Sequence, residues 1–314
     1  MLKKSALRRI MVSTLALVIA GVLYFFPNNE ENVPLVQNIE YVSANETPIY
    51  LLNPDLYVVR TNMATQNTDS LQLIKELVEG LTIGNDKKEY ISEHFSQIIP
   101  KNTKIIDISL ENGLLKLNFS KELLNVSKDL EEKMIEAIVY TLTEVKGVDE
   151  IMIFVEGSKL EMLPQSNVKL PNTLDRGYGI NKVYDITSIK DLTKTTVYYI
   201  GEFDDFIYYV PVTKISNEQE QNKIEIIIDE LKSSPIYETN LMSYLASSVE
   251  LENYEELENQ ITLSFNNAIF DDFGEKNILE EVKYSISLSI QDTLNVDEVI
   301  FKVDDEIIET FKEK

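Results

Sequence analysis

The chain has 314 residues, of which 44% are hydrophobic, and this length predicts about two packed domains. It contains no cysteine, which excludes disulfide bonds, thiolate metal sites and cysteine nucleophiles. The net charge is −24, and because residues 1–27 hold four basic residues and no acidic one, the remainder carries −28. Such an acidic surface repels phosphate backbones, so a nucleic-acid partner is not expected.

Residues 10–26 form an uncharged apolar run, IMVSTLALVIAGVLYFF, that follows a basic tail over residues 1–9. This arrangement predicts a transmembrane signal anchor, with the tail in the cytoplasm and the rest of the chain outside the cell membrane. The run is shorter than the ~20 residues of a usual span, so a cleaved signal peptide is the alternative. Cleavage before Gly21 would leave an apolar mature end, and we therefore expect the anchor to stay attached.

An internal repeat follows a linker over residues 27–53 that is rich in Pro, Asn and Glu. The segment Val148–Val155 matches Val296–Val303, since both begin with Val-Asp-Glu and continue as a strand. Upstream, Leu117–Ser120 corresponds to Leu263–Asn266. The repeat predicts two domains of one kind, at residues 54–162 and 194–314, joined by an inter-domain linker over residues 163–193.

The first copy shows an alternation of strand and helix patterns. A strand is predicted at residues 56–59, a helix at 73–81, a hairpin across Asn112-Gly113, a second helix at 130–145 and a last strand at 150–155. The helices are predicted from apolar residues at 3.6-residue spacing. Asn-Gly between alternating strands is a strong hairpin signal, because both turn positions need a positive φ angle.

The second copy repeats this order. It opens at residues 196–200, and residues 206–210 are predicted to add a hairpin across Asp204-Asp205. Helices are predicted at 224–231 and 278–290, and Asp272 and Glu275 have the spacing of a capping box for the second of them. Strands are predicted at 249–251, 261–265 and 299–303. The order β-α-β-β-α-β predicts an α+β fold in each copy, with two helices packed on one face of a mainly antiparallel sheet.

The repeat also predicts which core residues superpose. We expect Leu117 to fall on Leu263, Phe119 on Phe265, and Ile151 on Val299. All six should be buried, because they are the inward positions of alternating strands.

The sequence provides no set of residues for a catalytic, cofactor or metal site. His94 is the single histidine, and the second copy has no matching histidine, so we expect a surface or half-buried loop residue. The acidic pairs lack the alternating oxygen ligands of a calcium loop, and the ten glycines form no phosphate-binding loop. The pairs are Asp204-Asp205, Asp271-Asp272 and Asp304-Asp305.

Tyrosine is the enriched side chain that points to binding. Tyr198, Tyr199, Tyr208 and Tyr209 cluster on the long hairpin that opens the second copy. Tyrosine is favoured at protein interfaces, although it is also a good strand former. The four residues are therefore the predicted partner-binding surface, and a position in the strand core is the alternative.

The first copy resembles the GerMN domain family. The resemblance rests on Pro100–Ile105, Gly113–Ser120, Ala137–Glu144 and the strand over Val148–Gly157. The second copy is degenerate, since Ser285–Ile290 replaces the Tyr-Thr-Leu-Thr pattern of the first. The resemblance implies a non-enzymatic protein of endospore formation or germination, acting in a channel-like complex between mother cell and forespore. It also implies domains like ring-building motifs, and hence partners among envelope or sporulation-complex proteins and assembly into a ring or oligomer.

Two other functions remain open at this stage. One is an envelope module that binds cell-wall fragments or another envelope protein without any role in sporulation. The other is a hydrolase that uses acidic residues, which would require convergent carboxylates in a cleft.

Overall fold

The computed structural model describes residues 45–85, 91–188, 190–203, 206–217, 222–233, 240–272, 274 and 276–312. The predicted anchor, the predicted turn residues Asp204 and Asp205, and Glu275 lie outside these ranges. Among the residues described, no helix has the length and apolar character needed to cross a membrane.

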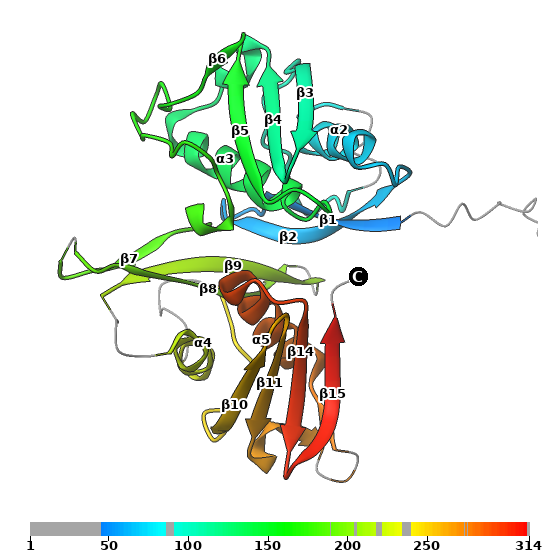
Figure 1. The fold of residues 1–314 in the computed structure, drawn as a ribbon, viewed down its shortest axis with the longest axis vertical. Coiled ribbons are helices and arrows are strands. Elements are labelled where there is room, and N and C mark those ends of the chain that lie inside the picture. The colour runs from blue at the N-terminus through cyan, green and yellow to red at the C-terminus, as the bar shows by residue number, and fades with distance from the viewer. Residues whose placement is uncertain are drawn as a thin grey trace, which may run out of the picture. The chain divides into compact units, whose positions relative to one another are not determined.

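The first copy contains the predicted order of elements (Figure 1). They are β2 (Val58–Thr65), α2 (Ser70–Leu81), β3 (Ile105–Glu111), β4 (Leu114–Phe119), α3 (Lys128–Leu142) and β5 (Glu150–Val155), with the short strand β6 (Ser158–Lys159) at the end. The β3–β4 hairpin turns at Asn112 and Gly113, which both have positive φ angles, as predicted.

The second copy follows the same order with additions. It comprises β8 (Thr193–Phe203), β9 (Phe206–Ser216), α4 (Lys223–Lys232), β10 (Leu251–Leu257), β11 (Gln260–Phe265), β12 (Phe270–Asp272), β13 (Asn277–Ile278), α5 (Glu280–Leu294), β14 (Glu298–Val303) and β15 (Glu306–Lys312). Helix α5 begins after Leu279, so the capping box predicted at Asp272 does not start it; Asp272 ends β12 instead.

The repeat is confirmed at the level of single residues. The sheets have the orders β3-β4-β5-β6 and β10-β11-β14-β15. Leu117 pairs with Ile153 where Leu263 pairs with Phe301, and Phe119 pairs with Val155 where Phe265 pairs with Val303. The six residues predicted to superpose are all buried.

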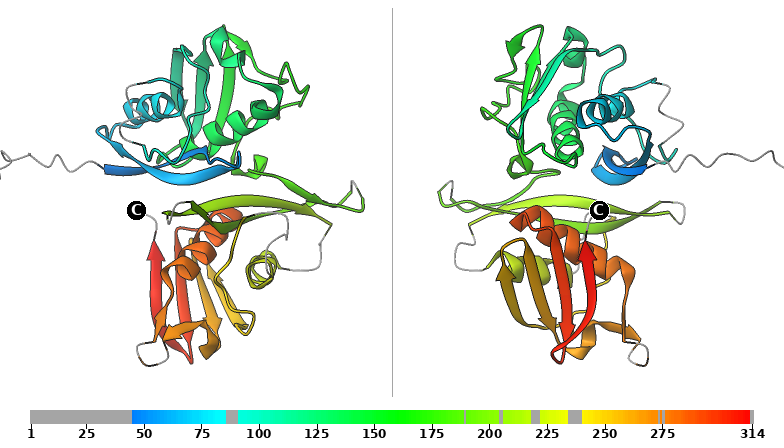
Figure 2. Two further views of the ribbon diagram at one scale, coloured as in Figure 1. Left: turned by 180° about the vertical axis from the view of Figure 1, so that it is seen from behind. Right: turned by 45° about the vertical axis from the view of Figure 1, so that its right-hand side comes forward.

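The mainly antiparallel pairing is as predicted, because two of the three strand pairs in each four-stranded sheet are antiparallel. The pairs β4–β5 and β11–β14 are the parallel ones. The expected single sheet per copy is wrong, because the opening strands lie in a separate sheet with the order β1-β2-β9-β7, in which β8 pairs with β9. The helices therefore have a sheet on either side: α2 contacts β1 and β3, and α5 contacts β8 and β14 (Figure 2).

Residues 45–52, predicted to belong to the linker, form strand β1, and Ile49–Leu52 are buried. Both copies therefore open with a hairpin, β1–β2 in the first and β8–β9 in the second. Leu52 bridges to Ser96 as Ile200 bridges to Met242, so β1 corresponds to β8.

The segment predicted as an inter-domain linker is packed against both copies. Four of its apolar residues are buried, and one of them, Leu174, forms a backbone bridge with Ile151 of β5. It also contains the 3-10 helix η3 (Arg176–Tyr178) and strand β7 (Val183–Asp185), which pairs with β9. The buried residues are Leu163, Leu170, Leu174 and Ile180.

Candidate functional site between the two copies

Three of the four tyrosines predicted to form an exposed surface are buried. Tyr198 and Tyr199 on β8 and Tyr208 on β9 are 0%, 4% and 6% exposed. Tyr209 is half-buried and stacks on Tyr284. The reason is that β8 and β9 lie between the helices of their own copy and the first copy, so their side chains face protein on both sides. The prediction of an exposed tyrosine surface is therefore corrected.

Tyr198 instead belongs to a polar network that joins the copies. Its hydroxyl lies 2.9 Å from that of Tyr50 on β1, 148 residues earlier. Tyr50 donates a 3.0 Å hydrogen bond to Glu144, and Tyr198 donates one of 2.5 Å to Asp292. Glu144 and Asp292 have the same separation in the sequence as the two tyrosines. The site thus consists of one tyrosine–carboxylate pair from each copy, placed face to face.

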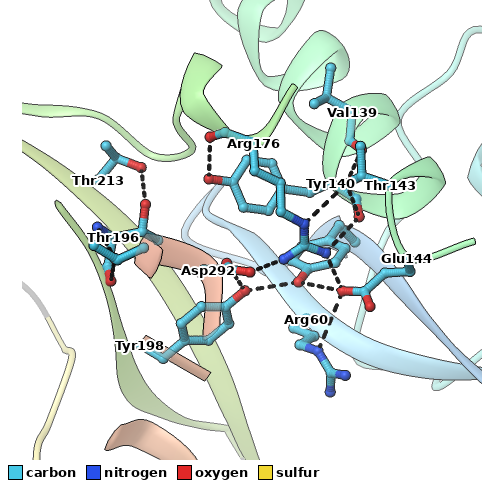
Figure 3. A network of polar contacts seen from close by, with 12 residues as sticks. Arg60, Val139, Tyr140, Thr143, Glu144, Arg176, Thr196, Tyr198, Thr213 and Asp292 are labelled. Carbon is cyan, nitrogen blue, oxygen red and sulfur yellow. Dashed lines mark hydrogen bonds and ion pairs between the residues drawn. The ribbon is translucent and has the colours of Figure 1, made fainter. Parts of the chain in front are cut away.

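Arg176 of η3 lies between the two pairs (Figure 3). Its guanidinium group forms ion pairs with Glu144 of the first copy and Asp292 of the second. Nε also donates a 3.1 Å hydrogen bond to Thr143, and the Tyr140 hydroxyl donates to the Arg176 carbonyl oxygen at 3.0 Å. One residue from the connecting segment therefore binds a carboxylate of each copy.

The charges of the network balance. Arg60 on β2 lies 3.9 Å from Glu144, so two guanidinium groups accompany two carboxylates. Their side chains are 22% exposed or less. Buried charges are tolerated only when they are paired, and removal of one partner leaves the other uncompensated. The network is therefore a strong constraint on how the two copies fit together.

The two carboxyl groups differ in acidity. Burial acts to raise the pKa of Glu144, but the Arg176 and Arg60 guanidinium groups outweigh it and hold that pKa below its usual value. Burial raises the pKa of Asp292, and Arg176 offsets this only in part. Burial also raises the pKa of Tyr50 and of Tyr198, so both phenols stay protonated.

A second connection is made by Asn181. Strands β2 and β9 pair through a single residue pair, Arg60 with Tyr209. Next to it, the Asn181 amide nitrogen donates to the carbonyl oxygens of Val58 on β2 and Pro211 on β9, at 2.7 and 2.8 Å. The Val58 N–H donates back to the Asn181 side-chain oxygen at 2.9 Å. Asn181 thus links β2 of the first copy to β9 of the second, next to the one residue pair that joins these strands directly.

Equivalent hydroxyls fix the tyrosine strands to the helices. The Tyr50 N–H donates to Thr141 of α3 at 2.9 Å, and the Tyr198 N–H donates to Ser289 of α5 at 2.8 Å. Ser289 lies in the segment where the second copy departs from the family pattern. The hydrogen bond is nevertheless kept, because serine presents the same hydroxyl group as threonine.

The other residues considered from the sequence do not join this network. His94 is half-buried, as predicted, and stacks on Phe206 with ring centroids 5.1 Å apart. Asp304 and Asp305 are exposed in the turn after β14. Across the described parts of the chain, no cluster of three or more potential ligands could hold a metal ion.

The residues that sequence analysis missed are Tyr50, Glu144, Arg176 and Asp292. One signal could have found three of them: the 148-residue separation of the Val-Asp-Glu turns also relates Tyr50 to Tyr198 and Glu144 to Asp292. Arg176 has no counterpart in a repeat, because it lies between the copies. These groups belong to one network of hydrogen bonds and ion pairs and are mostly shielded from solvent, so the arrangement serves to hold two domains in one orientation.

Comparisons with known proteins agree with this architecture. The family model described as "Germane: Sporulation and spore germination" matches residues 22–161 and 196–309. The spore germination protein GerM of Bacillus subtilis (strain 168) is 30% identical over 262 residues, which cover 81% of this chain and 70% of that protein. The solved structure of the tandem GerMN domains of the Bacillus subtilis sporulation protein GerM has a TM-score of 0.77 at 26% identity, covering 86% of this chain and 97% of that one. The chain therefore belongs to the Germane family of sporulation and spore germination proteins.

Proposed function

We propose that this protein is a non-enzymatic scaffold of the cell envelope that acts in endospore formation or germination. In this proposal residues 10–26 anchor it in the cell membrane and the two GerMN domains lie outside the cytoplasm, where they join the channel-like complex between mother cell and forespore. The names of its relatives support the role in sporulation or germination. The predicted partners are other envelope or sporulation-complex proteins.

The observation that carries the scaffold role is the Arg176 network. Two domains on a flexible linker would move independently, whereas a shared sheet and a buried, charge-balanced network hold these two at one orientation. A fixed orientation is of use to a component that must place two binding surfaces at a set angle. The Arg176 guanidinium group, the two carboxylates and the two tyrosine hydroxyls are hydrogen-bonded to one another, as a structural junction requires.

Deletion of the gene in its own host tests the role. We expect fewer heat-resistant spores or slower germination, with normal vegetative growth. Complementation with the full chain should restore the spore count, and complementation with residues 1–162 or with a chain lacking residues 54–162 should not. A deletion strain that sporulates and germinates normally would refute the role in this pathway.

The anchor is tested in the same strain. Membrane fractionation should find the full chain in the membrane pellet, and added protease should digest the domains in protoplasts. A chain without residues 10–26 should fail to restore the spore count. Full protection from protease would contradict the proposed orientation.

A further inference from the structure

Two titratable side chains of helix α3 meet at Asn181 of the connecting segment. The Lys133 Nζ donates a 3.5 Å hydrogen bond to the Asn181 side-chain oxygen. Glu136, one turn further along α3, accepts a 3.0 Å hydrogen bond from the Asn181 backbone N–H. Asn181 and Glu136 are 6% and 3% exposed, and Lys133 is half-buried. An amine, a carboxamide and a carboxyl group are therefore gathered at one place that is largely shielded from water.

The surroundings move Lys133 and Glu136 towards their neutral forms. Burial lowers the pKa of Lys133, and although Glu136 opposes this, the neighbouring Lys182 ammonium group adds to it. Burial raises the pKa of Glu136, and Lys182 offsets this only in part. A desolvated lysine next to another cation is a typical amine nucleophile, and a carboxyl group with a raised pKa is suited to proton transfer. Two groups whose pKa values are displaced in this way are candidates for a reacting base and acid.

We propose that Lys133 and Asn181 form an intramolecular isopeptide bond. The lone pair of the neutral Lys133 Nζ attacks Cγ of Asn181, and a bond forms between Nζ and Cγ. The bond between Cγ and Nδ2 then breaks, and Nδ2 leaves as ammonia. The proton that Nζ loses is the one that the ammonia gains, and the Glu136 carboxyl group transfers it. Because one amide replaces another, the step needs no oxidant, reductant or cofactor.

The geometry is suited to this reaction. In the structure the two side chains are unlinked, with Nζ 3.5 Å from the Asn181 oxygen and the carbon Cγ one C=O bond of about 1.2 Å from that oxygen. Reacting atoms must approach to about 3–3.5 Å, and the flexible four-carbon stem of lysine permits the remaining movement. The target does not turn away, because hydrogen bonds to Val58 and Pro211 hold the Asn181 amide in place.

The bond has a consequence for the junction. It ties α3 of the first copy covalently to the residue that links β2 and β9. A chain without cysteine has no disulfide bond for this purpose. The oxygen of the new amide can still accept the hydrogen bond from the Val58 N–H, and its remaining N–H can still serve one of the two carbonyl groups that Nδ2 binds. The crosslink does not depend on the proposed role in sporulation.

Intact-mass spectrometry of the purified full chain in detergent tests the proposal. We expect a mass below that of the sequence by one ammonia molecule, and a tryptic digest should contain one branched peptide that joins Lys133 to Asn181. Lys133→Arg keeps the positive charge but cannot form this amide, so it should have the full mass of its sequence. Lys128→Arg, at the start of the same helix, is the matched control and should still lose ammonia. Glu136→Gln should form the bond at least about a hundredfold more slowly, because the carboxyl group that transfers the proton is gone.

Several results would overturn the crosslink. These are a folded, unmodified chain that keeps its full mass after prolonged incubation, a Lys133→Arg variant that still loses ammonia, and a loss of ammonia that maps to a succinimide at Asn112-Gly113 without a branched peptide. Circular dichroism shows whether each variant is folded. If the unmodified chain keeps its full mass while gene deletion still lowers the spore count, only the crosslink fails and the proposed function stands.

Discussion

The two copies share their core and differ at their edges. Leu117, Phe119 and Ile151 have buried equivalents in Leu263, Phe265 and Val299, in the same register. At the sheet edge, by contrast, Ile106 is replaced by Glu252 and Lys104 by Glu250. Core positions are held by packing, whereas an edge position contacts solvent or a partner and tolerates any residue that suits that contact.

The junction between the copies is neither fully shared, like the core, nor different in each copy, like the sheet edges. It uses equivalent tyrosines and carboxylates from both copies, but a single arginine from outside the repeat binds both carboxylates. The equivalent tyrosine–carboxylate pairs of the two copies are thus joined by one arginine that has no equivalent. Replacing Arg176 should therefore disturb the junction more than any other single substitution.

Replacement of Arg176 by Met should have the largest effect. It leaves Glu144 and Asp292 buried without their shared partner, and loss of one member of a buried ion pair costs about 3–5 kcal/mol. Urea denaturation should show this loss, and transitions of the two copies should separate if the junction couples them. The control adds Glu144→Gln and Asp292→Asn to Arg176→Met, which should recover part of the loss. A single variant as stable as the unmodified chain would show that the network does not hold the copies together.

Equivalent core truncations should have equal effects. Leu117→Ala and Leu263→Ala each remove a fully buried side chain from the same place in the repeat, so each should lower the free energy of unfolding by about 2–5 kcal/mol. Thermal denaturation of both variants provides the comparison. Ile106→Ala at the exposed edge is the matched control, with a small expected effect. A large difference between the two leucines would mean that one copy dominates the stability of the whole.

The side-chain hydroxyls of Thr141 and Ser289 should contribute equally to the free energy of unfolding, and each should contribute less than a core leucine. Thr141→Ala and Ser289→Ala each leave a buried tyrosine N–H without its acceptor, at a cost of about 1–3 kcal/mol. Thr141→Ser retains the hydroxyl and should lose less than Thr141→Ala. Slower amide exchange at Tyr50 and Tyr198 in the unmodified chain than in the variants would confirm the assignment, and unchanged exchange would refute it.

The sequence predicted the repeat, both helices of each copy and the buried strand residues, because these depend on local periodicity. It did not predict that β1 exists, since Pro48 and the preceding Asn and Glu residues are typical of a linker, and Ile49–Leu52 are buried only by contact with distant helices. The same cause explains the error on the tyrosines. Tyrosine is a residue type typical of interfaces, and Tyr198 and Tyr208 do lie in an interface. That interface is between the two copies of one chain.

The smallest expected effect concerns the unequal carboxyl groups. Because the pKa of Glu144 is lowered in the folded chain, Glu144 contributes stability above its unfolded value of about 4.3, and that contribution is lost as the pH falls through the folded value. The pKa of Asp292 is raised, so the folded chain binds this proton more tightly and Asp292 acts in the opposite direction, favouring the folded state as the pH falls.

Two variants separate these opposing contributions. Asp292→Asn retains only the Glu144 contribution, so its stability should fall more steeply than that of the unmodified chain between about pH 5 and 3. Glu144→Gln retains only the Asp292 contribution and should fall less steeply. The other carboxyl groups of the chain are common to both variants, so the difference between their two pH profiles isolates the pair. Urea denaturation at a series of pH values measures it. Parallel profiles would mean that the two copies present equivalent carboxyl groups to Arg176 after all.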